Sequence, residues 1–473
     1  MAKKVFWVSD QSKIIVDGVK TYDATLKVGT NHPTMSKLRI LKNLIALSIG
    51  FLLLFSAYLG LANLQSTLNI DENVGLISLS TLYGAMIISS LFLPKLIIRK
   101  YGLKSTLVMC SLVCVPYICA NFYPRIYTLV PASFLSGLVG PLLWSAQSTY
   151  LNEISVLYAS LTSESAEIVT ARFFGVFFMA CQSTQLWGNM ASFFILRPDT
   201  EKSYFNETVA CGAEYCFELN DNLKSPSDEK KNMLIGIYLV SGCLAIFIIA
   251  VFLDTIQRKN EDDNESLASR IFATLNQIKK PKQILLLPLT VFSGLQQGFF
   301  VGDFTKAYIA CAWGIYHVGL VFMFIGVVDA FTAFTAGRLV KYIPRVVIML
   351  IGTAGNIAVS IVLLLWHPNN GEYIMFFILA GIWGVSDGTL QTMLNTFYGV
   401  LFRSEEEAAY STYRLWESVG FIIAFVSSNF LCVAPKIYIA LTVLIIGMIC
   451  YITTEVIVFH QSTKSKQYID TVL

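Results

Sequence analysis

One acidic residue is unusual because it lies in the middle of a long apolar stretch. Asp387 occupies the centre of the run 373–400, where a charge in membrane hydrocarbon costs about 2.5–3.5 kcal/mol on insertion scales. Gln391 lies in the same run, and further amides lie in or at the ends of other apolar stretches, namely Gln147, Asn63 and Gln296. Together these side chains predict a polar cavity between helices, with Asp387 as its only deep charge. The alternative is that they hydrogen bond between helices and hold a bundle together.

Two arginines lie close to acidic residues at the ends of apolar stretches. Arg172 follows Glu164 and Glu167, and Arg414 lies three residues before Glu417. A spacing of three places Arg414 and Glu417 on one helical face, where they can pair. These residues predict an ion-pair lock on the cytosolic side of the molecule. For Glu164, Glu167 and Arg172 the alternative is a solvated acidic loop.

Nothing in the chain predicts catalysis or a bound cofactor. There is no phosphate-binding P-loop, no G-x-S-x-G placed on a strand and no H-E-x-x-H pair. The four histidines are scattered, so no metal site can be assembled from their spacing. The net charge of +3 is too small to indicate a nucleic-acid partner. We therefore expect a protein that is not an enzyme.

The segment 197–231 is polar and carries two chemical signals. Asn206 begins an Asn-Glu-Thr acceptor for N-glycosylation, and Cys211 and Cys216 follow it. A disulfide between these two cysteines and a pair of free thiols are both compatible with the spacing. A second acceptor begins at Asn264 in 254–282, and we expect it to stay unmodified.

The last residues of the chain fit a short peptide motif. Leu473 is a terminal aliphatic residue and Thr471 a hydroxyl residue two positions earlier. This pair is what a PDZ domain binds when it adds a peptide as a strand and holds its carboxylate. A plain, flexible tail from Gln461 onward is the alternative.

The elements that must position these residues are membrane-spanning helices. Hydrophobic residues make up 55% of the chain and charged residues 14%, against about 25% charged in a soluble domain. The apolar runs are continuous rather than alternating, which excludes a lipid-facing barrel. The twelve predicted helices are 43–64, 74–98, 105–122, 126–150, 171–196, 232–253, 283–303, 316–337, 345–366, 373–400, 412–433 and 437–459. We expect an all-α polytopic protein in the lipid bilayer.

The basic residues predict the orientation. An even number of spans places both termini on one side, and 26 of the 34 Lys and Arg residues fall on that side. The positive-inside rule therefore places the tails 1–42 and 460–473 in the cytosol. The segment 197–231 is then extracytoplasmic.

The two halves of the chain resemble each other. Gly137-x-x-Gly140 precedes Gln147 at the same spacing as Gly381-x-x-Gly384 precedes Gln391. Six helices in 43–253 and six in 283–459, joined by a cytosolic linker 254–282, are the layout of the major facilitator fold. The loop 99–104 is basic but lacks the aspartate of that fold's gating signature, which argues against ordinary alternating access.

Five segments together resemble the Unc-ninety-three family, the ion-channel regulatory branch of the major facilitator superfamily. They are 140–151, which reads GPLLWSAQSTYL, and 42–66, 172–189, 303–306 and 383–418. The first is close to the family motif G-x-P-L-W-x-A-Q-G-x-Y-L, with Ser148 in place of its second glycine. The chain looks most like an A-type member.

The resemblance implies a function that the spacing of residues does not show. One branch of the family regulates two-pore-domain potassium channels, and another escorts Toll-like receptors to endosomes. The leading hypothesis is therefore an accessory subunit of a potassium channel at the plasma membrane, with an endosomal membrane as the alternative. A solute or ion transporter that uses the cavity around Asp387, and a trafficking chaperone for receptors, are the rival functions.

Overall fold

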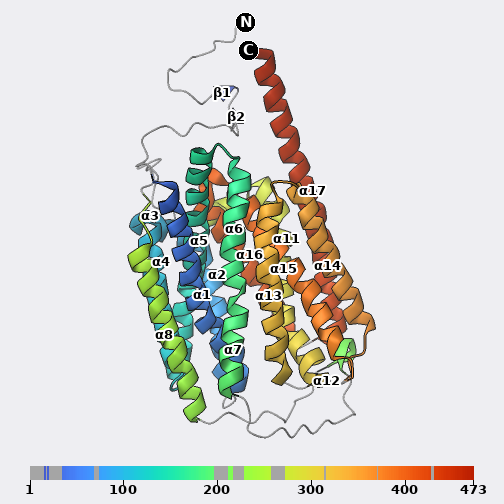
Figure 1. Cartoon of the computed structure of the whole chain (residues 1–473). Coiled ribbons are helices and arrows are strands. Elements are labelled where there is room, and N and C mark those ends of the chain that lie inside the picture. Colours follow the sequence, from blue (N-terminus) through green and yellow to red (C-terminus); the bar gives the residue numbers. More distant parts are fainter. Residues whose placement is uncertain are drawn as a thin grey trace.

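The computed structural model describes most of the chain as a bundle of helices. The described residues are 15–16, 19–20, 35–68, 74–196, 211–216, 228–256, 272–313, 316–369, 371–427 and 431–472. Two strands of two residues each, β1 (Ile15–Val16) and β2 (Val19–Lys20), pair antiparallel. Everything else with regular structure in these ranges is helical. In Figure 1 the long helices run side by side, and α1 begins at the end of the bundle where α17 leaves it.

In the predicted first half, two of the predicted spans, 74–98 and 171–196, are each divided into two helices. The helices of this half are α1 (Lys37–Leu68), α2 (Val74–Phe92), α3 (Pro94–Tyr101), α4 (Leu103–Ala120), α5 (Ile126–Thr162), α6 (Ala166–Gln182), α7 (Thr184–Leu196) and α8 (Asp228–Phe252). Between α2 and α3 the chain bends by 66°. Pro94 begins α3, where its missing N–H costs least. The second break, at Ser183, separates α6 from α7.

The second set of helices begins inside the predicted linker. A short helix, α10 (Ala273–Ile278), lies against α2 and α16, so part of 254–282 is ordered as a helix rather than as a plain loop. The remaining elements are α11 (Pro281–Phe299), the π-helix η3 (Phe300–Ala310), α12 (Cys311–Trp313), α13 (Tyr316–Leu339), α14 (Arg345–Leu365), α15 (Tyr373–Leu401), η4 (Arg403–Glu405), α16 (Glu406–Ser427) and α17 (Val433–Val472). A 3₁₀ turn, η2 (Gly212–Glu214), lies between α7 and α8.

The all-helical membrane architecture is confirmed, but the count of twelve spans is not. Among the described residues nine helical segments are long and apolar enough to cross a membrane, and the bent pair α2–α3 makes a tenth. The predicted spans 171–196 and 412–433 fall on segments outside this set. The first is divided between α6 and α7, and the second lies on α16, which carries four charged residues. Twelve spans therefore remain a prediction.

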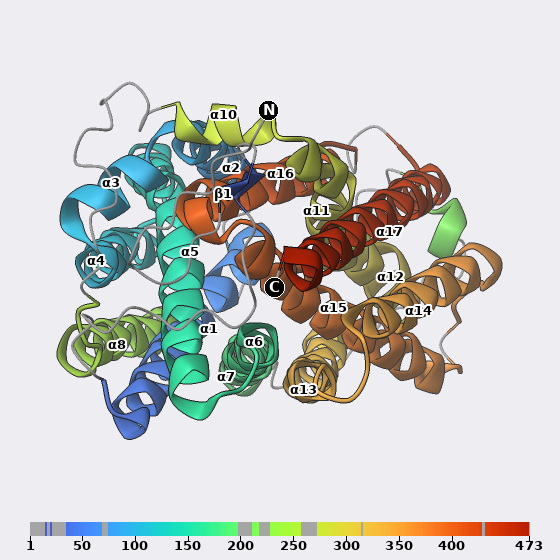
Figure 2. The ribbon, with the colours of Figure 1, turned by 90° about the horizontal axis from the view of Figure 1, so that it is seen from above.

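Small residues bring the two sets of helices into close contact. Gly175 of α6 and Gly337 of α13 face each other, and a Cβ added to Gly337 would lie 2.4 Å from the carbonyl oxygen of Ala171. Glycine at a helix crossing lets backbones approach and gain van der Waals contact, which stabilises bundles in lipid. Figure 2, seen along the bundle, shows α6 and α7 beside α13, with α1, α4, α5 and α8 on one side and α14, α15 and α17 on the other.

Candidate functional site

Asp387 lies at the junction of the two predicted halves and is 1% exposed. Its carboxylate accepts a hydrogen bond from Gln296 Nε2 of α11 at 2.6 Å and another from Gln182 Nε2 of α6 at 2.9 Å. The bond to Gln296 was expected from the sequence. The bond to Gln182 was not, and it joins the first half to the second. Gln182 is the last residue of α6, so the break at Ser183 lies directly beside the site.

A second carboxyl group, that of Asp329 on α13, lies next to Asp387. Asp329 is 3% exposed, and the two carboxyl groups are close enough to share a hydrogen bond when one of them is protonated. Gly388 makes this approach possible, because a Cβ there would lie 2.5 Å from Asp329 Oδ1. The prediction that Asp387 is the only deep charge is therefore wrong. The sequence places Asp329 in an apolar run, but not opposite Asp387.

A second group of hydrogen bonds lies one helical turn from Asp387, on the side towards α16. Gln391, one helical turn after Asp387, donates from Nε2 to Ser293 Oγ at 2.9 Å, and Tyr413 donates to Gln391 Oε1 at 3.1 Å. Ser293 Oγ also lies 3.4 Å from Glu417 Oε1. These bonds connect α11, α15 and α16, and all of these side chains are buried.

Arg414 and Glu417 form the pair that their spacing suggests, with Nη1 and Oε2 2.5 Å apart. Both side chains of the pair are buried. The guanidinium also lies over the ring of Trp144 on α5, at 4.5 Å from its centroid. An aromatic face attracts a desolvated cation, so Arg414 makes a further contact between the two halves.

Of the two remaining members of the predicted cavity, Gln147 does not hydrogen bond to this cluster. Gln147 is fully buried, and its Oε1 accepts a hydrogen bond from the neighbouring Ser148 at 3.0 Å. Asn63 lies on α1, but its side chain is outside the described residues. Asp387, Gln296 and Gln391 hydrogen bond to side chains of other helices. They therefore hold helices together in this conformation.

The two glutamates of the predicted cytosolic lock, Glu164 and Glu167, pair with two different arginines. Arg172 pairs with Glu164 at 3.0 Å within the first half. Glu167 pairs instead with Arg345 of α14 at 2.6 Å, and Arg345 also binds both oxygens of Glu455 on α17. Sequence reasoning missed Arg345 because its partners Glu455 and Glu167 are 110 and 178 positions away in the chain, and no local spacing connects them.

Three further contacts join the halves at the same end of the bundle. Asn152 Nδ2 donates to Glu406 Oε1 at 2.6 Å, and Ser411 donates to the carbonyl of Ser90. Arg99 lies 3.9 Å from Glu407. The basic loop 99–104 has no acid of its own, and this contact supplies one from α16. Glu407, at the start of α16, therefore gives Arg99 an acidic neighbour that the loop itself lacks.

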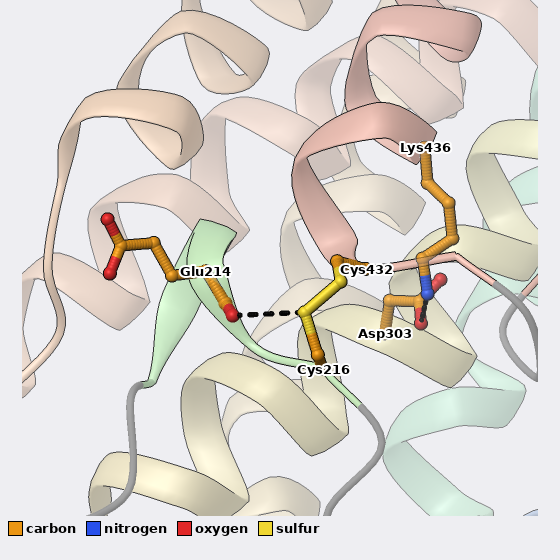
Figure 3. The surroundings of a disulfide bond; sticks show 5 residues. All are labelled: Glu214, Cys216, Asp303, Cys432 and Lys436. Atoms are coloured by element: carbon orange, nitrogen blue, oxygen red, sulfur yellow. Dashed lines mark hydrogen bonds and ion pairs between the residues drawn. A yellow bond between two sulfur atoms is a disulfide. The ribbon is translucent and has the colours of Figure 1, made fainter.

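The cysteines of the long loop pair with the second half and not with each other. Cys211 is bonded to Cys311. Cys216 is bonded to Cys432, and Figure 3 shows this second disulfide. This corrects the expectation of a Cys211–Cys216 bridge or two free thiols. The partners are 100 and 216 residues away in the chain, which spacing cannot reveal.

Beside the second disulfide, Lys436 of α17 and Asp303 of η3 form a buried ion pair at 2.5 Å (Figure 3). Both side chains are less than a tenth exposed, and the pair ties the first turns of α17 to the π-helix. The glycosylation acceptors at Asn206 and Asn264 lie outside the described residues.

The C-terminal segment is helical, which differs from the flexible tail expected from Gln461 onward. The helix α17 continues to Val472 and so includes Thr471, although the side chain of Thr471 is not described. Leu473 lies outside the described residues. A PDZ domain binds an extended peptide, so this last turn must unwind before it can bind one.

Comparison with known proteins identifies the family. The family model described as "Ion channel regulatory protein UNC-93" matches residues 66–452, which is most of the chain. This chain belongs to the UNC-93 family. It is 42% identical to protein unc-93 homolog A of Xenopus laevis over 87% of this chain and 92% of that protein. The human homolog A is 40% identical over 87% of this chain and 93% of its own length.

A more distant relative has a more specific name. The putative potassium channel regulatory protein unc-93 of Caenorhabditis elegans is 33% identical over 90% of this chain and 63% of its own length.

Solved structures support the fold alone. The proton:xylose symporter XylE has a TM-score of 0.62 at 11% identity, covering 88% of this chain and 95% of its own. The human organic anion transporter MFSD10 has a TM-score of 0.60 at 10% identity, covering 87% and 99%. The chain therefore has a major facilitator-like fold.

Proposed function

We propose that this protein is a regulatory subunit of a potassium channel of the two-pore-domain type. The observation that carries the proposal is the match to the C. elegans protein, whose name gives potassium channel regulation. That match runs through 90% of the chain, so the proposal concerns the helix bundle as a whole and not a single loop.

The interior of the bundle favours an accessory role over solute transport. Asp387 and Gln391 both bond to neighbouring helices, and helix-to-helix bonds of this kind stabilise a scaffold. Five helices, α6, α11, α13, α15 and α16, meet around these side chains. A transporter of the major facilitator type would bind its solute between the halves, where these bonds now lie.

The orientation is part of the same proposal. We place both termini in the cytosol, the segment 197–231 outside, and the protein in the plasma membrane. The bonds Cys211–Cys311 and Cys216–Cys432 support this orientation, because disulfides persist in oxidising compartments. Asn206 lies in the same segment and would be glycosylated. Two six-helix halves, 43–253 and 283–459, complete this arrangement.

Whole-cell recording tests the channel function directly. A two-pore-domain potassium channel is expressed alone and together with this protein, and surface biotinylation gives the amount of channel at the membrane. The proposal expects a change in current per surface channel. An unchanged current at equal surface expression contradicts it. Radiotracer uptake in cells without the channel, and surface delivery of a co-expressed receptor, separately test the transporter and the chaperone.

A matched pair of variants connects the current to the bundle. Gly337→Leu places a side chain where α13 contacts α6, whereas Gly319→Ala on the same helix meets no atom within 4 Å. We expect the first to lose the effect on current and the second to keep it, at matched surface levels.

The orientation has its own test. Glycosidase should shift the mobility of the wild-type protein and of Asn264→Gln but not that of Asn206→Gln. Loss of the shift only in Asn264→Gln would show that the orientation is the reverse of the one proposed.

Deleting Leu473 tests the PDZ ligand formed by Thr471 and Leu473. Surface clustering should fall while glycosylation is unchanged.

A further inference from the structure

Among the described residues, the acid pair Asp329–Asp387 forms no salt bridge with a basic side chain. Arg414, the arginine of α16, is already paired with Glu417. From α6, the Cys181 thiol is close enough to Asp329 to interact with it electrostatically. Other charges on the helices packed against it have partners elsewhere: Asp303 with Lys436, Arg345 with Glu167 and Glu455, and Arg172 with Glu164.

Two carboxylates in contact cannot both stay ionised at a site removed from water. Their repulsion is strong at low dielectric, and two acids in such a site retain one proton between them. The hydrogen bonds indicate which residue keeps it. Asp387 accepts N–H groups from Gln182 and Gln296, and such bonds favour the ionised form.

Asp329 is the member of the pair whose surroundings favour the protonated form. Its Oδ1 is buried and has no hydrogen-bond partner. A proton on Asp329 would let it donate to Asp387 across the contact between α13 and α15. Asp387 would then accept three hydrogen bonds, and the pair would carry a single negative charge.

Gln182 makes the site sensitive to how the halves pack. Gln182 belongs to α6, whereas Asp329, Asp387 and Gln296 belong to the second set of helices. Separation of α6 from α13 would withdraw this amide, which by itself favours the protonated pair, and would admit water to the carboxyl groups, which favours release of the proton and outweighs the lost hydrogen bond. The proton could then leave to water, because hydration stabilises the second carboxylate.

We propose that Asp329 and Asp387 form a proton-binding site that holds one proton while the halves are packed as in this structure. Asp329 carries the proton and donates it in a hydrogen bond to Asp387. When the halves separate, the Asp329 O–H bond breaks, the proton passes to water, and both residues become carboxylates. The site goes beyond channel regulation, because binding of the proton needs no channel.

Infrared spectroscopy of the protein in lipid nanodiscs tests the site without a channel. At neutral pH the wild-type protein should show the C=O stretching band of a protonated carboxyl group. This band should shift when aspartate side chains are labelled with ¹³C, and not when glutamate side chains are. Absence of an aspartate band from the folded protein would overturn the proposal, and this readout needs no substitution.

Variants assign the band to its residue. Asp329→Asn should lose the band, because Asp387 then stays ionised among donors. Glu372→Gln, which changes an exposed carboxylate on the loop before α15, should keep it. A band of full intensity in Asp329→Asn would place the proton elsewhere and overturn the proposal.

Two further measurements complete the test. The first asks whether the pair binds a proton or a metal cation, and the second asks whether α6 affects the binding. Replacing choline with sodium at constant pH should leave the band unchanged; its loss would show that the pair binds sodium instead. Gln182→Leu removes an N–H donor to ionised Asp387, so the band should persist to higher pH than in the wild type. An unchanged titration in Gln182→Leu would refute the connection to the packing of the halves.

Discussion

Arg345 gives the sharpest test of how burial sets the strength of an ion pair in this bundle. Its guanidinium binds both oxygens of Glu455 at 2.9 and 3.0 Å and Glu167 at 2.6 Å, and it lies 4.2 Å from the centroid of the Phe397 ring. The Arg345 side chain is 8% exposed and that of Glu455 15%, whereas Glu167 is 41% exposed. One cation therefore makes a buried pair and a half-exposed pair at once.

The two pairs should differ in their contribution to the free energy of unfolding. Arg345→Ala leaves Glu455 buried without a cation, and removing one partner of a buried pair costs about 3–5 kcal/mol. Glu167→Gln removes only the half-exposed arm, and exposed pairs contribute about 0–1 kcal/mol. Arg172→Ala, which breaks the partly exposed pair with Glu164, is the matched control, with a cost also of about 0–1 kcal/mol.

Reversible unfolding by SDS in lipid bicelles gives the free energy of unfolding of each variant. A double-mutant cycle of Arg345→Ala and Glu455→Gln isolates the coupling of the buried pair from the other effects of each substitution. The coupling should exceed that of Arg345 with Glu167. If Arg345→Ala costs no more than Arg172→Ala, burial does not set the strength of this contact, and the reasoning is refuted.

Three further predictions concern other parts of the bundle. Gly337→Ala should destabilise the fold by about 1–3 kcal/mol through overpacking against α6, measured by the same SDS unfolding, while Gly319→Ala should not. Cys432→Ser should cost about 5 kcal/mol on the chain-entropy model, and non-reducing peptide mapping should find Cys216 free. Hydrogen bonds from Arg39 and Lys42 hold the pKa of Asp254 below its ordinary value against partial burial, so Asp254→Asn should destabilise at neutral pH. The folded-state pKa is lowered, so the difference in stability between wild type and Asp254→Asn should begin to shrink as pH falls below about 4, the pKa of an unfolded aspartate. It should vanish only below the lowered pKa of the folded state.

Local spacing predicted those parts of the site that lie within one helix. Arg414 and Glu417 pair because three residues nearly complete a helical turn. The amide Gln296 bonds to Asp387 as expected, because both lie in apolar runs where a polar group must find a partner. The apolar runs likewise indicated helices throughout the described residues, although not their breaks.

Contacts between distant segments could not be obtained in the same way. Asp329 meets Asp387 only because Gly388 leaves room between α13 and α15, and neither residue signals the other in sequence. The disulfides connect Cys211 and Cys216 to residues that close large loops, so the nearby pairing suggested by spacing was wrong. The break at Ser183, which places Gln182 at the acid pair, has no proline or charge to mark it.

The described contacts between the halves differ in kind at the two ends of the bundle. Where α1 begins, the contacts are ion pairs and hydrogen bonds, such as Glu167–Arg345 and Asn152–Glu406, and these can break and re-form without any change in covalent bonding. At the other end, where η2 lies, the connection between α7 and α8 is bonded covalently to Cys311 and Cys432. Separation at the first end breaks only reversible contacts, whereas the disulfides limit movement at the second. A change in packing would therefore begin at the ion-paired end and reach the acid pair through α6 and α13, which connects charge at that end to the proton held by Asp329 and Asp387.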